Sequence, residues 1–167
     1  MRLLAIVLIT LLFSCKSSKQ EKIAKELQEI NLEAIKEAFD FTEVKTGENS
    51  DYKKTQNIII RTEEEMDLNW SRMFGKYPRK PPIPMIDFKK KQLLLVAAGE
   101  QPNGGYTIKV SAIEKSTKGI LVTIENAKPE KSCNNTSVLT YPFQLIEMTK
   151  TEKEITFARV SKIKACK

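Results

Sequence analysis

Three cysteines and the absence of any histidine limit the chemistry open to this 167-residue sequence. Without an imidazole group, Ser-His-Asp and Cys-His arrangements are excluded, and so are most metal sites and general-base catalysis by histidine. Carboxylate pairs and a Ser–Lys couple are compatible with the composition, but no spacing in the chain singles one out. The sequence therefore predicts no catalytic residue, no metal site and no cofactor.

Cys15 lies where a bacterial lipoprotein carries its lipid. Residues 3–13 form an apolar run after a single arginine. A membrane-spanning helix needs about 20 residues, so this shorter run is typical of a secretory signal. The segment Leu12-Phe13-Ser14-Cys15 resembles the bacterial lipobox, with Phe13 bulkier than that pattern prefers. We expect residues 1–14 to be a signal peptide and Cys15 to be lipidated; an ordinary cleaved signal with an incidental Cys15 is the alternative.

Lipid on Cys15 would hold the protein at a membrane, because each buried CH₂ group contributes about 0.8 kcal/mol. The polar residues 16–20 then form a tether, with no acidic cluster after the cysteine. Residues 20–39 are expected to be helical, because apolar residues recur there at spacings of three and four. Residues 15–40 are therefore assigned to a lipidated tether and helix. The predicted location is the cell envelope, on the outer membrane and facing the periplasm.

Cys133 and Cys166 remain as an even pair in what would be an oxidising compartment. A disulfide between them closes a loop of about 34 residues, for which chain-entropy arithmetic gives roughly 3–4 kcal/mol. Two free thiols or a redox site are the competing interpretations. A structural disulfide is favoured, since redox pairs usually lie close together in the sequence.

Charge in this chain gives no sign of a nucleic-acid partner. The 28 basic and 21 acidic residues leave a net charge of +7, and the basic residues are scattered. Their densest cluster, Lys89-Lys90-Lys91, directly precedes an apolar run and is typical of a solvated strand flank. Nucleic-acid binding would require a basic stripe interleaved with aromatic side chains. The net charge could favour acidic surfaces or anionic lipid, but the scattered basic residues define no such patch.

Residues 41–167 read as one β-rich domain with a short helix. Thr62 and Glu65 have the spacing of a capping box, and Met66, Trp70 and Met73 follow on one helical face that Gly75 would end. At this spacing Trp70 is typical of a core residue rather than a binding one. The fold class is mainly β (α+β), an antiparallel sandwich or small barrel with one or two packed helices. Strands are expected at residues 57–61, 93–98, 106–112, 120–124, 141–148 and 155–160.

The most distinctive segment is a loop between two of these strands, Gly99-Glu100-Gln101-Pro102-Asn103-Gly104-Gly105-Tyr106. It resembles the G-x-x-P-T-G-G-Y signature in the C-terminal domain of the protease-complex subunit PrcB family, with Asn103 where that family often has Thr. Similarity continues at Tyr141–Ile146 and, upstream, at Gly47–Ser50 and Ile59–Trp70. The resemblance covers roughly residues 41–160.

The resemblance implies a protein that associates with a protease complex, with Gln101, Pro102, Asn103, Gly104, Gly105 and Tyr106 as a partner-binding loop. Binding would use exposed backbone and Pro102, with Gln101 and Asn103 as hydrogen-bonding groups. The alternative is a hairpin that needs Gly-Gly for its own geometry. Pro102, Gly105 and Tyr106 also match the N-P-T-T-G-Y turn of chagasin-type protease inhibitors.

The predicted function is therefore a non-catalytic envelope lipoprotein, a protein-binding module that associates with or stabilises a protease. The alternatives are a structural envelope lipoprotein without a protease partner and a chagasin-like inhibitor. Nothing positive in the sequence indicates a hydrolase.

Overall fold

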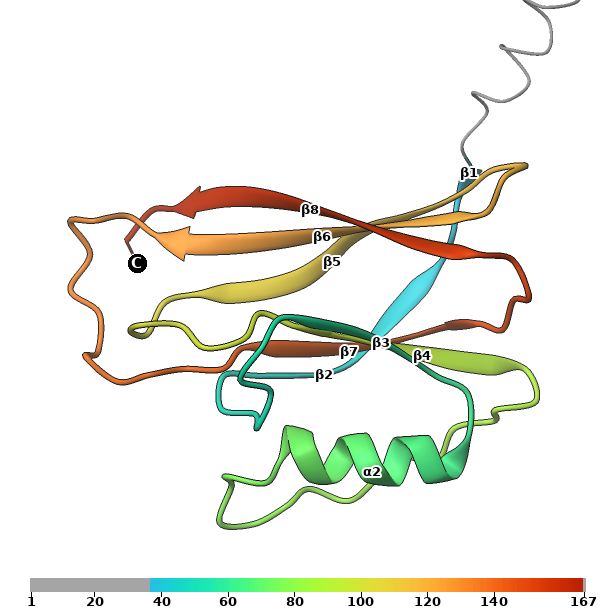
Figure 1. The fold of residues 1–167 in the computed structure, drawn as a ribbon, viewed down its shortest axis with the longest axis horizontal. Helices are drawn as coiled ribbons and strands as arrows, with labels where there is room; N and C mark the ends of the chain where they lie inside the picture. The colour runs from blue at the N-terminus through green and yellow to red at the C-terminus, as the bar shows by residue number, and fades with distance from the viewer. Residues whose placement is uncertain (1–36, 167) are drawn as a thin grey trace, which may run out of the picture. The chain divides into compact units, whose positions relative to one another are not determined.

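Two four-stranded sheets packed face to face form the framework of residues 37–166, the part of the chain that the computed structural model describes (Figure 1). Sheet A has the order β1-β5-β6-β8 and sheet B the order β2-β7-β4-β3, and both have open edges. The sandwich is thus confirmed, and the barrel is not formed. Sheet A contains β1 (Glu37–Ala38), β5 (Thr107–Lys115), β6 (Ile120–Pro129) and β8 (Ile155–Lys164). Sheet B contains β2 (Phe41–Gly47), β3 (Gln56–Ile60), β4 (Lys91–Ala97) and β7 (Phe143–Thr149).

The continuous apolar run of β4 has a simple cause, since both faces of this central strand are buried. Leu94 and Val96 face sheet A, where they pack against residues such as Val122 and Ile124. Leu93 and Leu95 face the opposite way, toward the helix. Sheet B therefore separates two apolar layers, one inside the sandwich and one beneath the helix (Figure 1).

The helix α2 (Glu63–Met73) covers the outer face of sheet B as its sequence pattern predicts. The Glu65 N–H donates to Thr62 Oγ1 over 3.2 Å, and the Glu65 carboxylate accepts from the backbone N–H of Arg61. Trp70 is 4% exposed, and its indole N–H donates to the Pro81 carbonyl, which confirms the core interpretation. The helix ends with Phe74 as C-cap, one residue before the predicted Gly75.

Three features differ from the sequence prediction. Glu37–Ala38 form β1 and pair with Glu114 and Lys115, so a helix reaching residue 39 is wrong at its end. Strand β2 was not expected, because an edge strand with mostly exposed side chains lacks a clear apolar alternation. Strands β6 and β8 run parallel, whereas an antiparallel architecture was expected. They can do so because the intervening β7 belongs to the other sheet.

The signal peptide, Cys15 and most of the predicted tether and helix lie outside the described residues. Within residues 37–166, no helix has both the length and the apolar character that crossing a bilayer requires.

Candidate functional site

The loop of residues 99–106 lies at one end of the sandwich, beside the segment that follows β6 (Figure 1, left). Gln101 and Thr140 exchange backbone hydrogen bonds of 2.8 and 3.1 Å. The Gly104 N–H donates to the Thr136 carbonyl over 3.0 Å, and Thr140 Oγ1 donates to the Asn103 carbonyl over 2.9 Å. The two segments are therefore joined along their length, and we call residues 99–106 and 133–142 the paired loops.

The Gly-Gly pair of the motif leaves room for this close approach. A Cβ atom on Gly104 would lie 2.4 Å from Thr136 Oγ1, and one on Gly105 would lie 2.5 Å from Asn135 Oδ1. Gly105 also has a φ of +88°, in the region that favours glycine. The two glycines therefore have a structural role, because the absence of a side chain lets the paired loops pack against each other.

A third segment supports the paired loops from the other side. The Glu100 N–H donates to the Lys53 carbonyl over 3.1 Å, and the Tyr141 N–H donates to the Glu48 carbonyl over 2.6 Å. The Tyr141 hydroxyl donates to Glu100 Oε2 over 2.8 Å, and this hydrogen bond raises the pKa of Tyr141. Lys76 Nζ lies 3.4 Å from the centroid of the Tyr141 ring, a cation–π contact. These contacts hold the base of the loops in one conformation.

Several backbone groups of the loop already have hydrogen-bond partners within the protein. The carbonyls of Gln101 and Asn103 and the N–H groups of Gln101 and Gly104 are occupied by hydrogen bonds to the neighbouring loop. The side-chain amide of Gln101 donates to the Ala98 carbonyl, and Asn103 and Tyr106 are half-buried. These backbone groups are therefore already engaged within the protein, whereas binding of a partner through them would require their present hydrogen bonds to break.

Exposed apolar side chains remain on the paired loops. Pro102 is exposed, and across from it Val138 and Leu139 are 63% and 49% exposed. Sequence reasoning found Pro102 but missed the other two, although adjacent apolar residues within a polar loop were a usable signal. We call Pro102, Val138 and Leu139 the loop-end surface.

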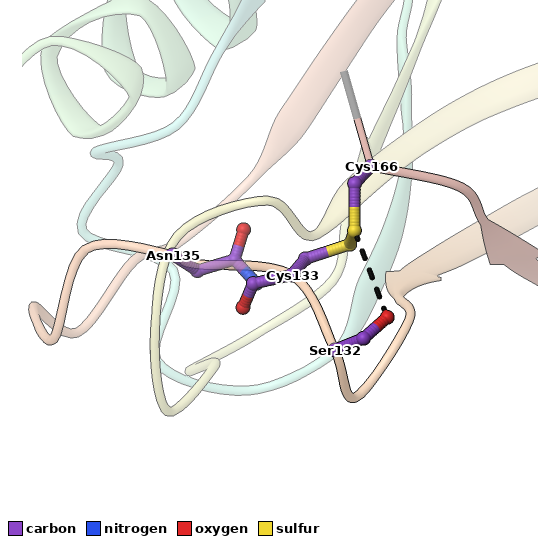
Figure 2. The surroundings of a disulfide bond; sticks show 4 residues. All are labelled: Ser132, Cys133, Asn135 and Cys166. Atoms are coloured by element: carbon purple, nitrogen blue, oxygen red, sulfur yellow. Dashed lines mark hydrogen bonds between the residues drawn. A yellow bond between two sulfur atoms is a disulfide. The ribbon is translucent and has the colours of Figure 1, made fainter.

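A disulfide fastens one of the paired loops to the C-terminal strand (Figure 2). It joins Cys133 and Cys166, as the sequence predicted, with a Cα–Cα distance of 5.2 Å. The Asn135 side-chain amide donates to the Cys133 carbonyl, and the Glu130 N–H donates to the Lys164 carbonyl nearby. The loop that carries Val138 and Leu139 is thus tied at its start to the end of β8.

Within the described part of the chain, no group of three or more His, Cys, Asp or Glu side chains could hold a metal ion.

The fold and this surface define a β-sandwich domain that presents braced loops at one end. Residues 93–149 match the family model described as PrcB C-terminal. The matched segment runs from β4 to β7 and contains the whole loop of residues 99–106. No curated protein and no solved structure matches the chain.

Proposed function

We propose that this protein is a non-catalytic binding module that associates with a protease and contacts it through the loop-end surface. The observation that carries the proposal is the PrcB C-terminal match, because that family suggests association with a protease complex and the matched segment includes the paired loops.

The structure of the loops supports binding by packing rather than by strand addition. Pro102, Val138 and Leu139 are exposed, while the backbone beneath them is held by hydrogen bonds and by the disulfide. A surface that is already ordered loses little conformational entropy on binding. Exposed apolar side chains on such a support are therefore well placed to fill a pocket on a partner.

We also propose that Cys15 carries lipid and places the protein in the cell envelope. The Cys133–Cys166 disulfide supports this proposal, since disulfides persist mainly in oxidising compartments outside the cytoplasm. Detergent-phase partition of the wild-type protein, lost in Cys15→Ser, tests the anchor independently of any partner.

The partner is tested by crosslinking in the cells that make the protein. We expect wild type to capture a peptidase and the double variant Val138→Asp/Leu139→Asp to lose it, because two charges would be desolvated on binding. Both side chains are largely exposed, so the melting temperature should change little. Leu68→Asp is the matched control, since Leu68 is 64% exposed on α2, away from the paired loops.

The outcomes separate the proposed function from its alternatives. A peptidase captured equally by all variants would refute the loop-end surface but keep the association. A set of captured envelope proteins without a peptidase would favour a structural role instead.

A further inference from the structure

Strand β8 forms the edge of sheet A along its full ten residues. In Figure 1 it is the red strand that borders β6. Within residues 37–166 no other strand pairs with its outer side. The strand contains no proline and no bulge, so its outer edge is a template on which another strand can add.

The pairing of β8 with β6 determines which side chains of β8 face the core and which face outward. Ile155 and Phe157 face the core between the sheets, and Ile163 follows on the same face but is 63% exposed. Val160 lies on the opposite, outer face and is 45% exposed. The strand thus shows two large apolar side chains that the monomer leaves partly uncovered.

We propose that β8 pairs with β8 of a second copy of this chain, antiparallel and centred on Val160. In this register the exposed Ile163 lies opposite the half-buried Phe157 of the partner copy, and Val160 lies opposite its own equivalent. Directly opposed apolar side chains on one face are the pairs that stabilise antiparallel strands. One contact therefore covers both exposed apolar side chains of β8.

Neighbouring registers are less favourable than the Val160 register. Moving the centre to residue 159 places Arg159 against Arg159. Moving it to residue 161 places Lys162 against Val160 and Arg159 against Ile163, so that charged side chains face both exposed apolar ones. A centre at Lys162 places lysine against lysine. Like charges directly opposite one another destabilise a strand pair. Side chains of odd-numbered and even-numbered residues lie on opposite faces of β8. A register that pairs odd with even residues would therefore not join the two copies into a continuous sheet with matching faces.

Lysines on an edge strand commonly discourage pairing, but here their places are compatible with it. In the Val160 register Lys162 lies opposite the small side chain of Ala158, and Lys164 opposite Thr156. The Lys162 ammonium is already paired with Glu125 at 3.7 Å. The two Lys162 residues of a dimer lie about 14 Å apart along the strands, beyond the screening length at physiological salt.

Sedimentation of the full-length protein in detergent tests the dimer. Over a dilution series from the millimolar to the micromolar range, we expect wild type to sediment as a dimer that dissociates on dilution. Val160→Lys places like charges at the centre and should sediment as a monomer throughout. Thr42→Lys is the matched control, because Thr42 is an exposed β-branched residue on β2, an edge of the other sheet.

Cysteine crosslinking tests the register. Under mild oxidation Val160→Cys should form a covalent dimer, since opposed Cα atoms of an antiparallel pair lie about 5 Å apart, within reach of a disulfide. Lys162→Cys is also exposed but should form no covalent dimer, and wild type gives the background from its native cysteines. Wild type that remains a monomer at every concentration overturns the proposal. A dimer that survives Val160→Lys, or equal crosslinking at both positions, also overturns it.

Discussion

A side chain added at Gly99, Gly104 or Gly105 would meet a neighbouring loop, but the atoms that it would contact differ between these positions. A Cβ atom on Gly99 would lie 2.9 Å from the backbone nitrogen of Thr55, and its φ is +78°. A Cβ atom on Gly104 would meet the hydroxyl of Thr136, which can rotate away. Two glycines of the same motif therefore have different structural importance.

We predict that Gly99→Ala lowers the free energy of unfolding by about 2 kcal/mol or more, because the left-handed conformation and the backbone contact both oppose it. Gly104→Ala should cost less than about 1 kcal/mol. Adding Thr136→Ala to Gly104→Ala should recover most of that loss. Urea unfolding measures all three variants, and equal losses at Gly99 and Gly104 would contradict the argument.

The ionisation of Tyr52, which lies on the helix side of sheet B, makes the stability of the protein depend on pH in the alkaline range. Its hydroxyl donates to Asn69 Oδ1 over 2.6 Å, and burial raises its pKa to about 12, although the nearby Arg72 guanidinium acts to lower it. The unfolded chain, with a tyrosine pKa of 10.0, loses this proton first as pH rises. The stabilisation is therefore complete below pH 10 and is lost between about pH 10 and 12.

We predict that Tyr52→Phe removes this part of the alkaline loss of stability. The variant should start about 1 kcal/mol less stable at neutral pH, since Asn69 loses its donor, and its free energy of unfolding should then fall less steeply between pH 10 and 12. Denaturant titrations at several pH values measure both slopes. Parallel slopes would mean that Tyr52 does not titrate in this range.

At the scale of elements, the sequence predicts those parts whose pattern is local. The unbroken apolar run of β4 and the cap and apolar face of α2 are enough to identify both. The glycine motif likewise locates the loop of residues 99–106. The partners of that loop were missed, because Thr140 contacts Asn103 across 37 residues and no local pattern encodes such a contact. The polar edge strand β2 was missed for a related reason, since an exposed strand need not alternate.

The disulfide stabilises the contact between the paired loops, because it fixes the start of the segment that packs on residues 99–106. We predict that Cys133→Ser/Cys166→Ser lowers the free energy of unfolding by about 3–4 kcal/mol. Hydrogen exchange at the Gly104 N–H should become faster, because its acceptor lies in the released loop. Ser132→Ala, beside Cys166, is the control and should change neither quantity. Unchanged exchange at Gly104 would show that the hydrogen bonds alone hold the paired loops.

At the scale of the whole sandwich, Arg159 joins the two sheets at the side where β3 and β8 are the edges. Its guanidinium donates to the Gln56 carbonyl and to Asn57 Oδ1 on β3, and to Asn126 Oδ1 on β6. Burial lowers the pKa of Arg159, but the group keeps its charge at neutral pH. Arg159 thus supplies one polar link between the two layers, in addition to the hydrogen bond that Gln144 Oε1 on β7 accepts from the Val110 N–H on β5.

We predict that Arg159→Lys lowers the free energy of unfolding by about 1–3 kcal/mol, because an ammonium cannot reach three acceptors as the planar guanidinium does. The reverse exchange on the same strand, Lys162→Arg, is the control and should stay within about 0.5 kcal/mol of wild type. Thermal or urea unfolding measures both. Equal stability of the two variants would mean that the acceptors of Arg159 are satisfied by water in its absence.

The parallel pairing of β6 with β8 also constrains the order in which this chain can fold. Because β7 lies between them in sequence and belongs to the other sheet, β6 stays unpaired on one side until β8 has been synthesised. Strands that are far apart in the sequence pair slowly during folding. A nascent chain halted before residue 155 would leave one edge of the apolar β6 unpaired and prone to aggregation. Synthesis of β8 therefore sets the point at which β6 gains its second partner strand.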